Sequence, residues 1–245
     1  MSATLAAGNS RQKKRGFWFW TTRIIGWGIL LFLLYNLWIF IQVWWMIDHN
    51  PDNTAFMKAQ LSEIRQDHPD AVLQHQWVPY DKISRNLKAA LVASEDAKFV
   101  DHKGFDVEGL KVAFQKNLKQ GRIVAGGSTI SQQLAKNLFL SASRNPLRKG
   151  EEAIITVMLE QMMTKERIFE IYLNSIEWGV GVFGAEAAAR HYYNTSASKL
   201  SARQAAKLAA MVPNPRYYDD HRQDGRLRRK TGIILRRMGS SDIPD

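Results

Sequence analysis

Residues 84–104 read SRNLKAALVASEDAKFVDHKG, and this stretch sets the fold class. Leu87, Leu91, Glu95 and Phe99 follow one another at intervals of four residues, which is the spacing of one helix face. The pattern predicts an amphipathic helix whose apolar side carries a single carboxylate, that of Glu95.

A carboxylate on the apolar side of a helix has two interpretations. Partial removal from water makes a carboxylate a better proton acceptor near neutrality, so Glu95 is a candidate general base. Alternatively, Glu95 is a structural acid paired with Lys98 or His102, which lie close by in the sequence. The helix pattern by itself favours neither interpretation.

Helical periodicity continues through the rest of the chain. It predicts helices at 84–98, 107–119, 128–140, 146–163, 165–176, 185–193 and 201–211, several of them separated by glycines. Residues 226–238 alternate basic and apolar positions, and we expect them to cap the domain rather than lie on a membrane surface. The sequence therefore predicts one compact, mostly α domain.

A different pattern precedes this domain. Residues 24–47 contain no charge, and a helix of that length is roughly 36 Å long, enough to cross a bilayer. Tryptophans mark both ends, as in the aromatic belts of membrane interfaces, at Trp18, Trp20, Trp27, Trp44 and Trp45. A cleaved signal peptide is the alternative, but the segment is too long for one.

The boundaries that follow are a tail at 1–16, a membrane-spanning helix at 17–47, a stalk that begins the membrane-proximal region at 48–82, and the main domain at 83–245. The stalk contains three prolines and a short predicted helix at 54–65.

Charge predicts the orientation of the span. Four basic residues precede it, namely Arg11, Lys13, Lys14 and Arg15, whereas Asp48 and Asp52 follow it. The positive-inside rule places the N-terminus in the cytoplasm and the main domain outside. Beyond residue 47 the chain holds 29 basic and 23 acidic residues, a net charge of +6 that suits anionic lipid head groups or a phosphate-bearing substrate. A location outside the cytoplasm argues against nucleic acid as a partner.

Several functional classes can be set aside. The chain has no cysteine, so it has neither a thiolate metal site nor a cysteine nucleophile. Gly179, Gly181 and Gly184 match a dinucleotide-binding string, but a helical pattern precedes them and no βαβ unit surrounds them. The K-T-G at 230–232 lacks the other spacings of a penicillin-binding transpeptidase. No H-E-x-x-H is present, which leaves a zinc protease unsupported.

Two glycines open a second polar cluster, GGSTISQQLAKN at 126–137. Ser128 or Thr129 can cap the following helix, and its first-turn N–H groups form an anion site to which Lys136 could add charge. Gln133 and Asn137 lie on the same segment. Without further context, an ordinary capped helix with a solvated polar face is the favoured interpretation.

Two further clusters place polar groups among apolar residues. Arg144, Arg148 and Lys149 lead into Glu152, which falls in a helix that is apolar nearly all round, so these cations are its expected partners. A later group could line a sugar site or only cap a helix, and it consists of Tyr172, Asn174, Glu177 and Trp178.

Taken together, these segments resemble the peptidoglycan glycosyltransferase family. The similar motifs are EDAKFVDHKG at 95–104, GGSTISQQLAKN at 126–137, Arg148-Lys149-x-x-Glu152, Tyr172-Leu173-Asn174, and residues 200–215. Their order and spacing agree over roughly residues 70–220. Without an attached transpeptidase domain, the chain looks like a monofunctional member.

The resemblance implies a mostly α, lysozyme-like fold with two lobes, a smaller mobile one near the membrane, and an active cleft between them. It also implies residue roles. Glu95 matches the general base and Glu152 the second acid. Lys136 and Arg144 match the residues that hold the donor diphosphate, and Gln133 and Arg148 match supporting cleft positions. We expect Ser128, Thr129 and Asn137 to bind substrate as well. The family's threonine is a serine at position 131, which keeps the hydroxyl.

The implied reaction polymerises lipid II, a polyprenyl-diphosphate-linked disaccharide-peptide, into β-1,4 glycan strands with inversion and release of polyprenyl diphosphate. The implied location is the cell inner membrane, with the N-terminus in the cytoplasm and the domain in the periplasm. The implied partners are lipid II, the growing lipid-linked strand, the membrane, and cell-wall synthesis or division proteins.

No cofactor is required by the sequence, although a divalent cation, Mg²⁺ or Mn²⁺, could assist at the diphosphate. The alternatives are a lysozyme-like lytic enzyme, against which the basic cluster argues, and a non-catalytic scaffold, against which the two acids argue.

Overall fold

The computed structural model describes residues 4–122, 126–141, 143 and 145–244. The chain divides into two compact units, Met1–Trp45 and Met46–Asp245, and each is considered by itself. The first unit is the helix α1 (Thr4–Trp45), whose segment Trp18–Trp45 is 28 residues long with a mean hydropathy of 2.2. That segment is long and apolar enough to cross a membrane. The helix itself begins well before the apolar segment.

The second unit is mostly α. Its helices are α2 (Ala55–Asp67), α3 (Arg85–Glu95), α4 (Val107–Gln120), α5 (Ile130–Phe139), α6 (Pro146–Met162), α7 (Lys165–Ser175), α8 (Ala185–Tyr193), α9 (Ala202–Met211), α10 (Pro215–Asp220) and α11 (Gly225–Arg237). Single 3-10 turns lie at Tyr80–Lys82, Ala197–Lys199 and Met238–Ser240. The helices that periodicity predicts are all present, whereas the short α10 has no periodic signal.

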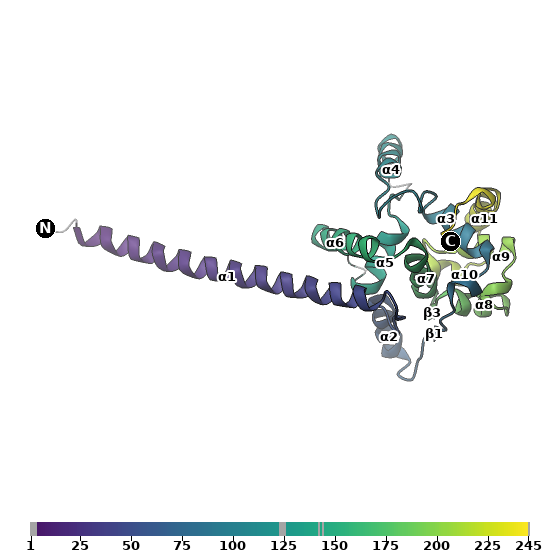
Figure 1. The fold of residues 1–245 in the computed structure, drawn as a ribbon, viewed down its shortest axis with the longest axis horizontal. Coiled ribbons are helices and arrows are strands. Elements are labelled where there is room, and N and C mark those ends of the chain that lie inside the picture. Colours follow the sequence, from purple (N-terminus) through teal and green to yellow (C-terminus); the bar gives the residue numbers. More distant parts are fainter. Residues whose placement is uncertain (1–3, 123–125, 142, 144, 245) are drawn as a thin grey trace. The chain divides into compact units, whose positions relative to one another are not determined.

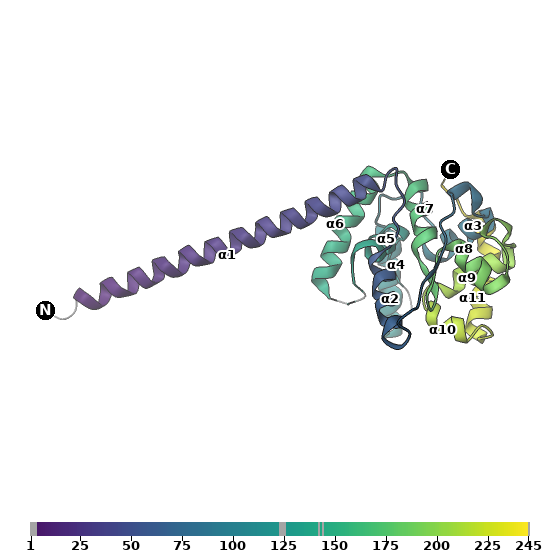
Figure 2. The same cartoon turned by 90° about the horizontal axis from the view of Figure 1, so that it is seen from below.

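The helices of this unit form two packed groups (Figures 1 and 2). In one group α3, α9 and α11 pack together, and in the other α5 packs against α2, α6 and α7. The helix α7 also contacts α8 and lies between the groups. Its residues Phe169, Tyr172 and Leu173 are completely buried and form the centre of the core.

A small sheet, which helical periodicity does not predict, packs against α8. Its strands are β1 (Gln74–His75), β2 (Glu177–Gly179) and β3 (Val182–Phe183), in the order β1-β3-β2. The strand β3 pairs parallel to β1 and antiparallel to β2. The two-residue strands are too short for a period of two to be recognised in the sequence.

Much of residues 48–82, expected to be a stalk, is packed into the second unit. The helix α2 lies against α5, and its buried Gln60 bonds to both Glu177 and the Gly181 amide, at 2.7 and 2.9 Å. Thr54 caps α2 through the Met57 amide. Prolines therefore interrupt the helices of this segment without detaching it from the domain.

The C-terminal stretch caps the domain, as the sequence favours. Leu227, Thr231 and Ile234 lie four and three residues apart on α11 and are buried against α9 and α3. The same side of α11 carries Lys230, three residues after Leu227, and brings its Nζ to 3.8 Å from Glu95 at the end of α3.

Candidate active site

Glu95 is the last residue of α3, and its carboxylate meets groups from two other helices. Ser94 Oγ donates a hydrogen bond of 2.9 Å to Oε1, and Gln133 Nε2 of α5 donates one of 3.1 Å to Oε2. Lys230 Nζ of α11 is 3.8 Å from Oε1. Only 10% of the Glu95 side chain is exposed, so the carboxylate is largely desolvated, as its helical spacing indicates.

The structural pairing considered for Glu95 is wrong. Lys98 Nζ binds Glu108 at 2.6 Å, and His102 Nε2 lies 2.9 Å from Asp96 Oδ1. Both candidate partners therefore bind other acids. Glu95 is left with two neutral donors and one amine at 3.8 Å.

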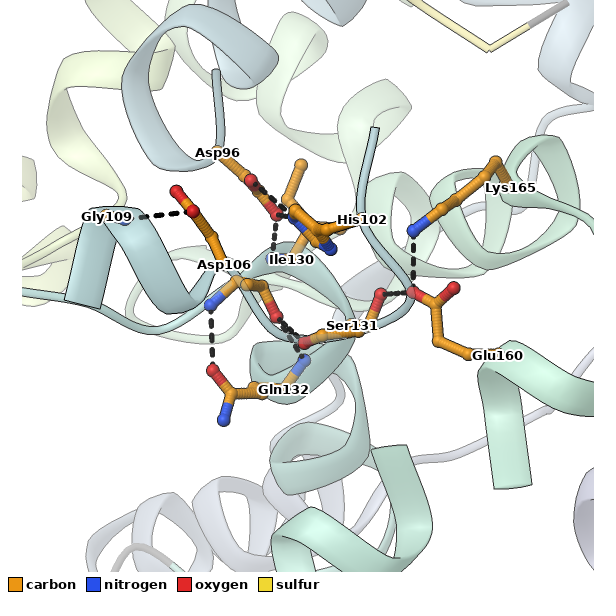
Figure 3. A network of polar contacts seen from close by, with 11 residues as sticks. Asp96, His102, Asp106, Gly109, Ile130, Ser131, Gln132, Glu160 and Lys165 are labelled. Atoms are coloured by element: carbon orange, nitrogen blue, oxygen red, sulfur yellow. Dashed lines mark hydrogen bonds and ion pairs between the residues drawn. The ribbon is translucent and has the colours of Figure 1, made fainter. Parts of the chain in front are cut away.

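Asp96 connects the end of α3 to the start of α5 (Figure 3). Its buried carboxylate accepts a hydrogen bond of 3.0 Å from the Ile130 amide and faces His102. At the other end of the cap, Thr129 Oγ1 accepts from the Gln132 amide at 3.2 Å, and Gln132 Oε1 accepts from the Thr129 amide at 3.0 Å. The first turn of α5 is thus an ordinary capped helix whose negative charge comes from Asp96. The amides of Ile130 and Gln132 already donate to Asp96 and Thr129, so the prediction that they bind an external anion is wrong.

Ser131, where the family resemblance leads us to expect a threonine, uses its hydroxyl in the core (Figure 3). Its Oγ donates to Glu160 Oε1, which also accepts from Lys165 Nζ at 2.8 Å. The hydroxyl therefore anchors α5 to α6 and α7.

Two neighbouring cavities lie beside Glu95 and the start of α5. The first, about 170 Å³, is lined by Glu95 and Asp96, by Asp106 and Leu110, and by the segment 126–129. The second, about 150 Å³, shares Asp106, Leu110, Gly127 and Ser128 and reaches Lys149 of α6. Ser128 and Thr129 thus line the same cavity as Glu95. The second cavity, beyond the shared wall, reaches Lys149, which binds Glu152.

Gly127 allows the shared wall to form. A Cβ atom at this position would lie 2.7 Å from Leu110 Cδ1 and 3.2 Å from its Cα, so any larger residue would push α4 away. No described atom lies within 4 Å of a Cβ built on Gly126. Of these two glycines, it is therefore Gly127 that lies too close to α4 for a side chain.

Glu152 is buried in α6 with the cations that the sequence assigns to it. Its carboxylate is bound by Arg148 Nη1 at 2.9 Å and by Lys149 Nζ. Only 4% of the Glu152 side chain and 13% of that of Arg148 are exposed. Arg148 Nε is buried without a hydrogen-bond partner among the described residues.

Three further residues are predicted to bind substrate, namely Lys136, Asn137 and Arg144. Lys136 lies on α5 with its Nζ 5.3 Å from the centre of the Phe56 ring of α2, and it lines neither of the two cavities described above. Asn137 is buried on the same helix. Arg144 lies outside the described residues.

The cluster at 172–178, which could line a sugar site or cap a helix, contains one residue of the candidate site and three structural residues. Tyr172 is completely buried, and its hydroxyl donates a hydrogen bond of 3.0 Å to Gln133 Oε1. Burial, and then the charge of Glu95, raises the pKa of Tyr172 well above its usual value, so the hydroxyl stays a donor.

By contrast, Asn174 binds the backbone of Val78, at 2.9 and 3.0 Å, and Trp178 is completely buried. Glu177 binds Gln60 and Arg216. A sugar site formed by these three residues is therefore contradicted, whereas Tyr172 orients the amide that binds Glu95.

Lys230 is the site residue that sequence reasoning misses. It appears there only in the K-T-G string that fails to match a transpeptidase, because a pairing between α3 and α11 has no local signal. Burial lowers the pKa of Lys230, and the charge of Glu95 partly opposes this shift.

No metal cluster is evident. Within residues 4–122, 126–141, 143 and 145–244, no group of three or more His, Cys, Asp or Glu side chains is placed to hold a metal ion.

A nearly buried glutamate thus lines one cavity, and that cavity shares a glycine-bearing wall with a second one, beside which a buried glutamate binds two cations. The mostly α domain that holds it follows an apolar helix. Comparison with known proteins specifies the class. The transglycosylase family model matches residues 60–239, and the chain belongs to this family.

Curated relatives carry a narrower name. The chain is 65% identical to a biosynthetic peptidoglycan transglycosylase of Chromobacterium violaceum, over 88% of this chain and 95% of the relative. Proteins of the same name from Methylobacillus flagellatus and Laribacter hongkongensis are 62% and 64% identical, each over 92% of this chain and 98% and 99% of the relatives. The chain is thus a glycosyltransferase of peptidoglycan synthesis with a mostly α, lysozyme-like domain, and its apolar helix fits a single-pass membrane anchor.

Proposed function

We propose that this enzyme polymerises lipid II into β-1,4 glycan strands by direct displacement, with inversion at the donor sugar. The acceptor's 4-hydroxyl loses its proton to Glu95 while its oxygen attacks the anomeric carbon of the donor. The bond from that carbon to the diphosphate oxygen breaks, and polyprenyl diphosphate leaves with the electron pair. Attack from the face opposite the leaving group converts an α-linkage to a β-linkage.

The partly buried carboxylate of Glu95 supports its role as the base. Its partners Ser94 and Gln133 are neutral donors that orient it without neutralising it. Tyr172 fixes the Gln133 amide so that its N–H₂ group, not its oxygen, faces Glu95. An oriented carboxylate that lines a cavity can reach a hydroxyl placed there.

The cations beside the second cavity are suited to the donor. Diphosphate is a good leaving group, so the reaction needs positive charge at the departing oxygens more than it needs a general acid. Glu152 holds Arg148 and Lys149 in place, and Lys149, whose side chain is half exposed and lines the second cavity, can donate to a phosphate oxygen. Lys136, Asn137 and Arg144 are proposed to complete the donor side, and Ser128 and Thr129 to line the path between the substrates.

The exposed apolar side of α4 is the observation that best supports a lipid-linked substrate. Leu110, Phe114 and Leu118 recur every four residues on this helix and are 56%, 63% and 65% exposed. Leu110 also lines both cavities. An apolar stripe that begins at the cavity wall is suited to a polyprenyl chain or to the lipid around it.

This chemistry also sets the proposed location. Lipid-linked units polymerised outside the cytoplasm require a domain on the periplasmic side of the inner membrane. The basic residues before the apolar segment of α1 support a cytoplasmic N-terminus. A Mg²⁺ or Mn²⁺ ion that accompanies the donor would be bound largely by the diphosphate oxygens.

The test is the full-length protein in an uncharged detergent, given lipid II labelled in its sugar. We expect glycan polymer that a muramidase degrades, and β-linkages by NMR. Release of fragments from preformed strands would instead indicate a lytic enzyme, and absence of both products a scaffold. A parallel reaction with an α-linked, water-soluble diphosphate analogue that lacks the polyprenyl chain should be much slower. Added EDTA separates metal-dependent from metal-independent turnover.

A further inference from the structure

A third cavity lies away from Glu95 and Glu152. It has a volume of about 520 Å³ and lies between α9, α11 and the loop before α11. Its lining is Arg203, Lys207, Arg222, Gln223, Leu227, Arg228, Thr231, Gly232 and Leu235. None of these residues lines either cavity of the candidate active site. Its volume is in the range of small-molecule sites.

Four cations line this cavity, and the described part of the chain leaves most of their charge uncompensated. Arg222 is bound by Asp219 at 2.9 Å and lies 4.7 Å from the centre of the Tyr192 ring. Arg203, Lys207 and Arg228 form no ion pair with a described carboxylate. Residues 200–240, which include all the lining residues, hold ten lysines and arginines but only three acids.

Lys207 shows the electrostatic effect of this arrangement. Burial, and then the positive charge of Arg222, lowers the pKa of Lys207. Like charges held close together in a partly buried position are destabilising, and an anion between them would remove that repulsion.

The geometry points to a binding site for a phosphate-bearing ligand with at least two negative charges, on the α9–α11 face and separate from the reaction. Three guanidinium groups suit phosphate oxygens because each presents parallel N–H donors. One carboxylate would neutralise only a fraction of this charge, whereas a diphosphate or a phosphate ester with a second anionic group matches it. Leu227 and Leu235 add an apolar flank, which fits an ester. The same chemistry could come from a soluble phosphate compound or from a lipid head group.

The test is isothermal titration of the full-length protein with inorganic diphosphate, in uncharged detergent, at low salt and without metal ions. The double variant Arg203→Gln/Lys207→Gln removes two cations from the cavity. Its control, Lys199→Gln/Arg237→Gln, removes the same charge from two exposed residues that do not line the cavity. We expect the first to weaken one diphosphate site by more than about tenfold and the second by less than about twofold. Equal weakening by both would overturn the proposal, because it would indicate only diffuse charge.

A second variant keeps the charge and fills the space. A Cβ on Gly232 would have only Arg236 Nη1 within 4 Å, at 3.7 Å, so Gly232→Leu should fold while its side chain occupies the cavity. Circular dichroism melting verifies the fold. Loss of the same site supports the proposal, and unchanged diphosphate binding by Gly232→Leu places the anion elsewhere and rejects it.

One further variant distinguishes this site from the proposed donor site, and a displacement experiment identifies the source of the phosphate ligand. Lys136→Gln should retain the α9–α11 site, since Lys136 does not line it; loss of that site in this variant would contradict the assignment. Displacement of diphosphate by micelles containing phosphatidylglycerol, but not phosphatidylcholine, assigns the site to a lipid head group. Failure of both lipids to displace it assigns the site to a soluble phosphate compound.

Discussion

Glu95 has its properties because α3 ends with it. At Asp96 the backbone leaves the helical region, with φ −162° and ψ 78°, and the Asp96 side chain turns toward α5. The periodic pattern alone would continue the helix to Lys98. Because the helix ends early, Asp96 binds the Ile130 amide of α5 while Glu95 binds Gln133, so two adjacent carboxylates that line one cavity have different partners.

Replacing Glu95 with Gln should remove most of the activity and little of the stability. The variant keeps the shape but accepts no proton, so we expect polymerisation to slow by about a hundred- to ten-thousand-fold. The free energy of unfolding should change by less than about 1 kcal/mol, because relief of a desolvated charge offsets the lost attraction to Lys230. Rate and melting temperature are measured on the same preparation. Glu63→Gln, which removes an exposed carboxylate on α2, is the control and should retain normal turnover.

Glu152→Gln should lower both activity and stability. It leaves Arg148 and Lys149 without their counter-charge, and the partly buried arginine makes this destabilising by about 3 kcal/mol. Glu186→Gln is a matched control, since Glu186 is also a buried acid with an arginine four residues away, on α8. We expect both variants to melt early, but only Glu152→Gln to turn over slowly at a temperature where both are folded. Normal turnover by Glu152→Gln would remove it from the donor site.

Lys230 makes stability depend on pH in an unusual direction. Because burial lowers its pKa in the folded state, the folded protein binds fewer protons than the unfolded chain between that pKa and the usual value of 10.5. The contribution of Lys230 to stability is therefore unfavourable at neutral pH and improves as pH rises through this window. We expect Lys230→Met to be relatively most stable near pH 7 and to lose that advantage toward pH 10.5. Urea unfolding at several pH values tests this, with the exposed Lys199→Met as control; a gap that widens with pH contradicts it.

At the scale of the element, α5 organises the site. Its N-terminal cap lies at the wall that the two cavities share, and Gln133 reaches from its second turn to Glu95. Thr129 has two roles in the cap, since its hydroxyl also donates a hydrogen bond of 2.7 Å to the carbonyl of Gly104. Cap formation and the position of the loop after α3 are therefore coupled.

Two capping boxes in this chain allow that coupling to be measured. Thr129 and Ser201 have the same relation to the glutamine three residues on, but Thr129 is buried and Ser201 is exposed. We expect Ser201→Ala to lower the free energy of unfolding by about 1 kcal/mol and Thr129→Ala by about 2 to 3 kcal/mol, because the carbonyl of Gly104 also loses its donor. Denaturant unfolding of both variants measures the difference. Equal losses would indicate that the bond to Gly104 contributes nothing net.

The elements also show how far the sequence could be read. Helix existence follows from local periodicity, and the ion pair of Glu152 with Arg148 follows from spacing within one helix. What the sequence missed depends on contacts between distant segments. The pairing of Asp96 with the start of α5, and the approach of Lys230 to Glu95, join residues that no repeat relates. The motif resemblance includes Gln133, but it does not indicate that Tyr172 orients the Gln133 amide toward Glu95.

For the whole molecule, the chain combines an apolar helix with a basic domain. The segment Trp18–Trp45 has the length and hydropathy of a membrane span, and the chain beyond residue 47 keeps a net charge of +6. A domain held near anionic head groups by one helix needs no strong membrane affinity of its own. The membrane then holds both the enzyme and its substrates, since the proposed donor and acceptor both carry lipid chains.

The orientation of that span is the last prediction. The four basic residues at 11–15 and the acids Asp48 and Asp52 favour an N-terminus inside and a domain outside. Protease added to intact spheroplasts should therefore digest the domain and leave a protected fragment that contains the N-terminus. A variant with glutamines at the four basic positions and lysines at 48 and 52 reverses the charge difference, and some of its molecules should become resistant. Full protection of the unaltered domain would contradict both the orientation and the periplasmic substrate, because lipid-linked units exposed outside would then be out of reach of Glu95.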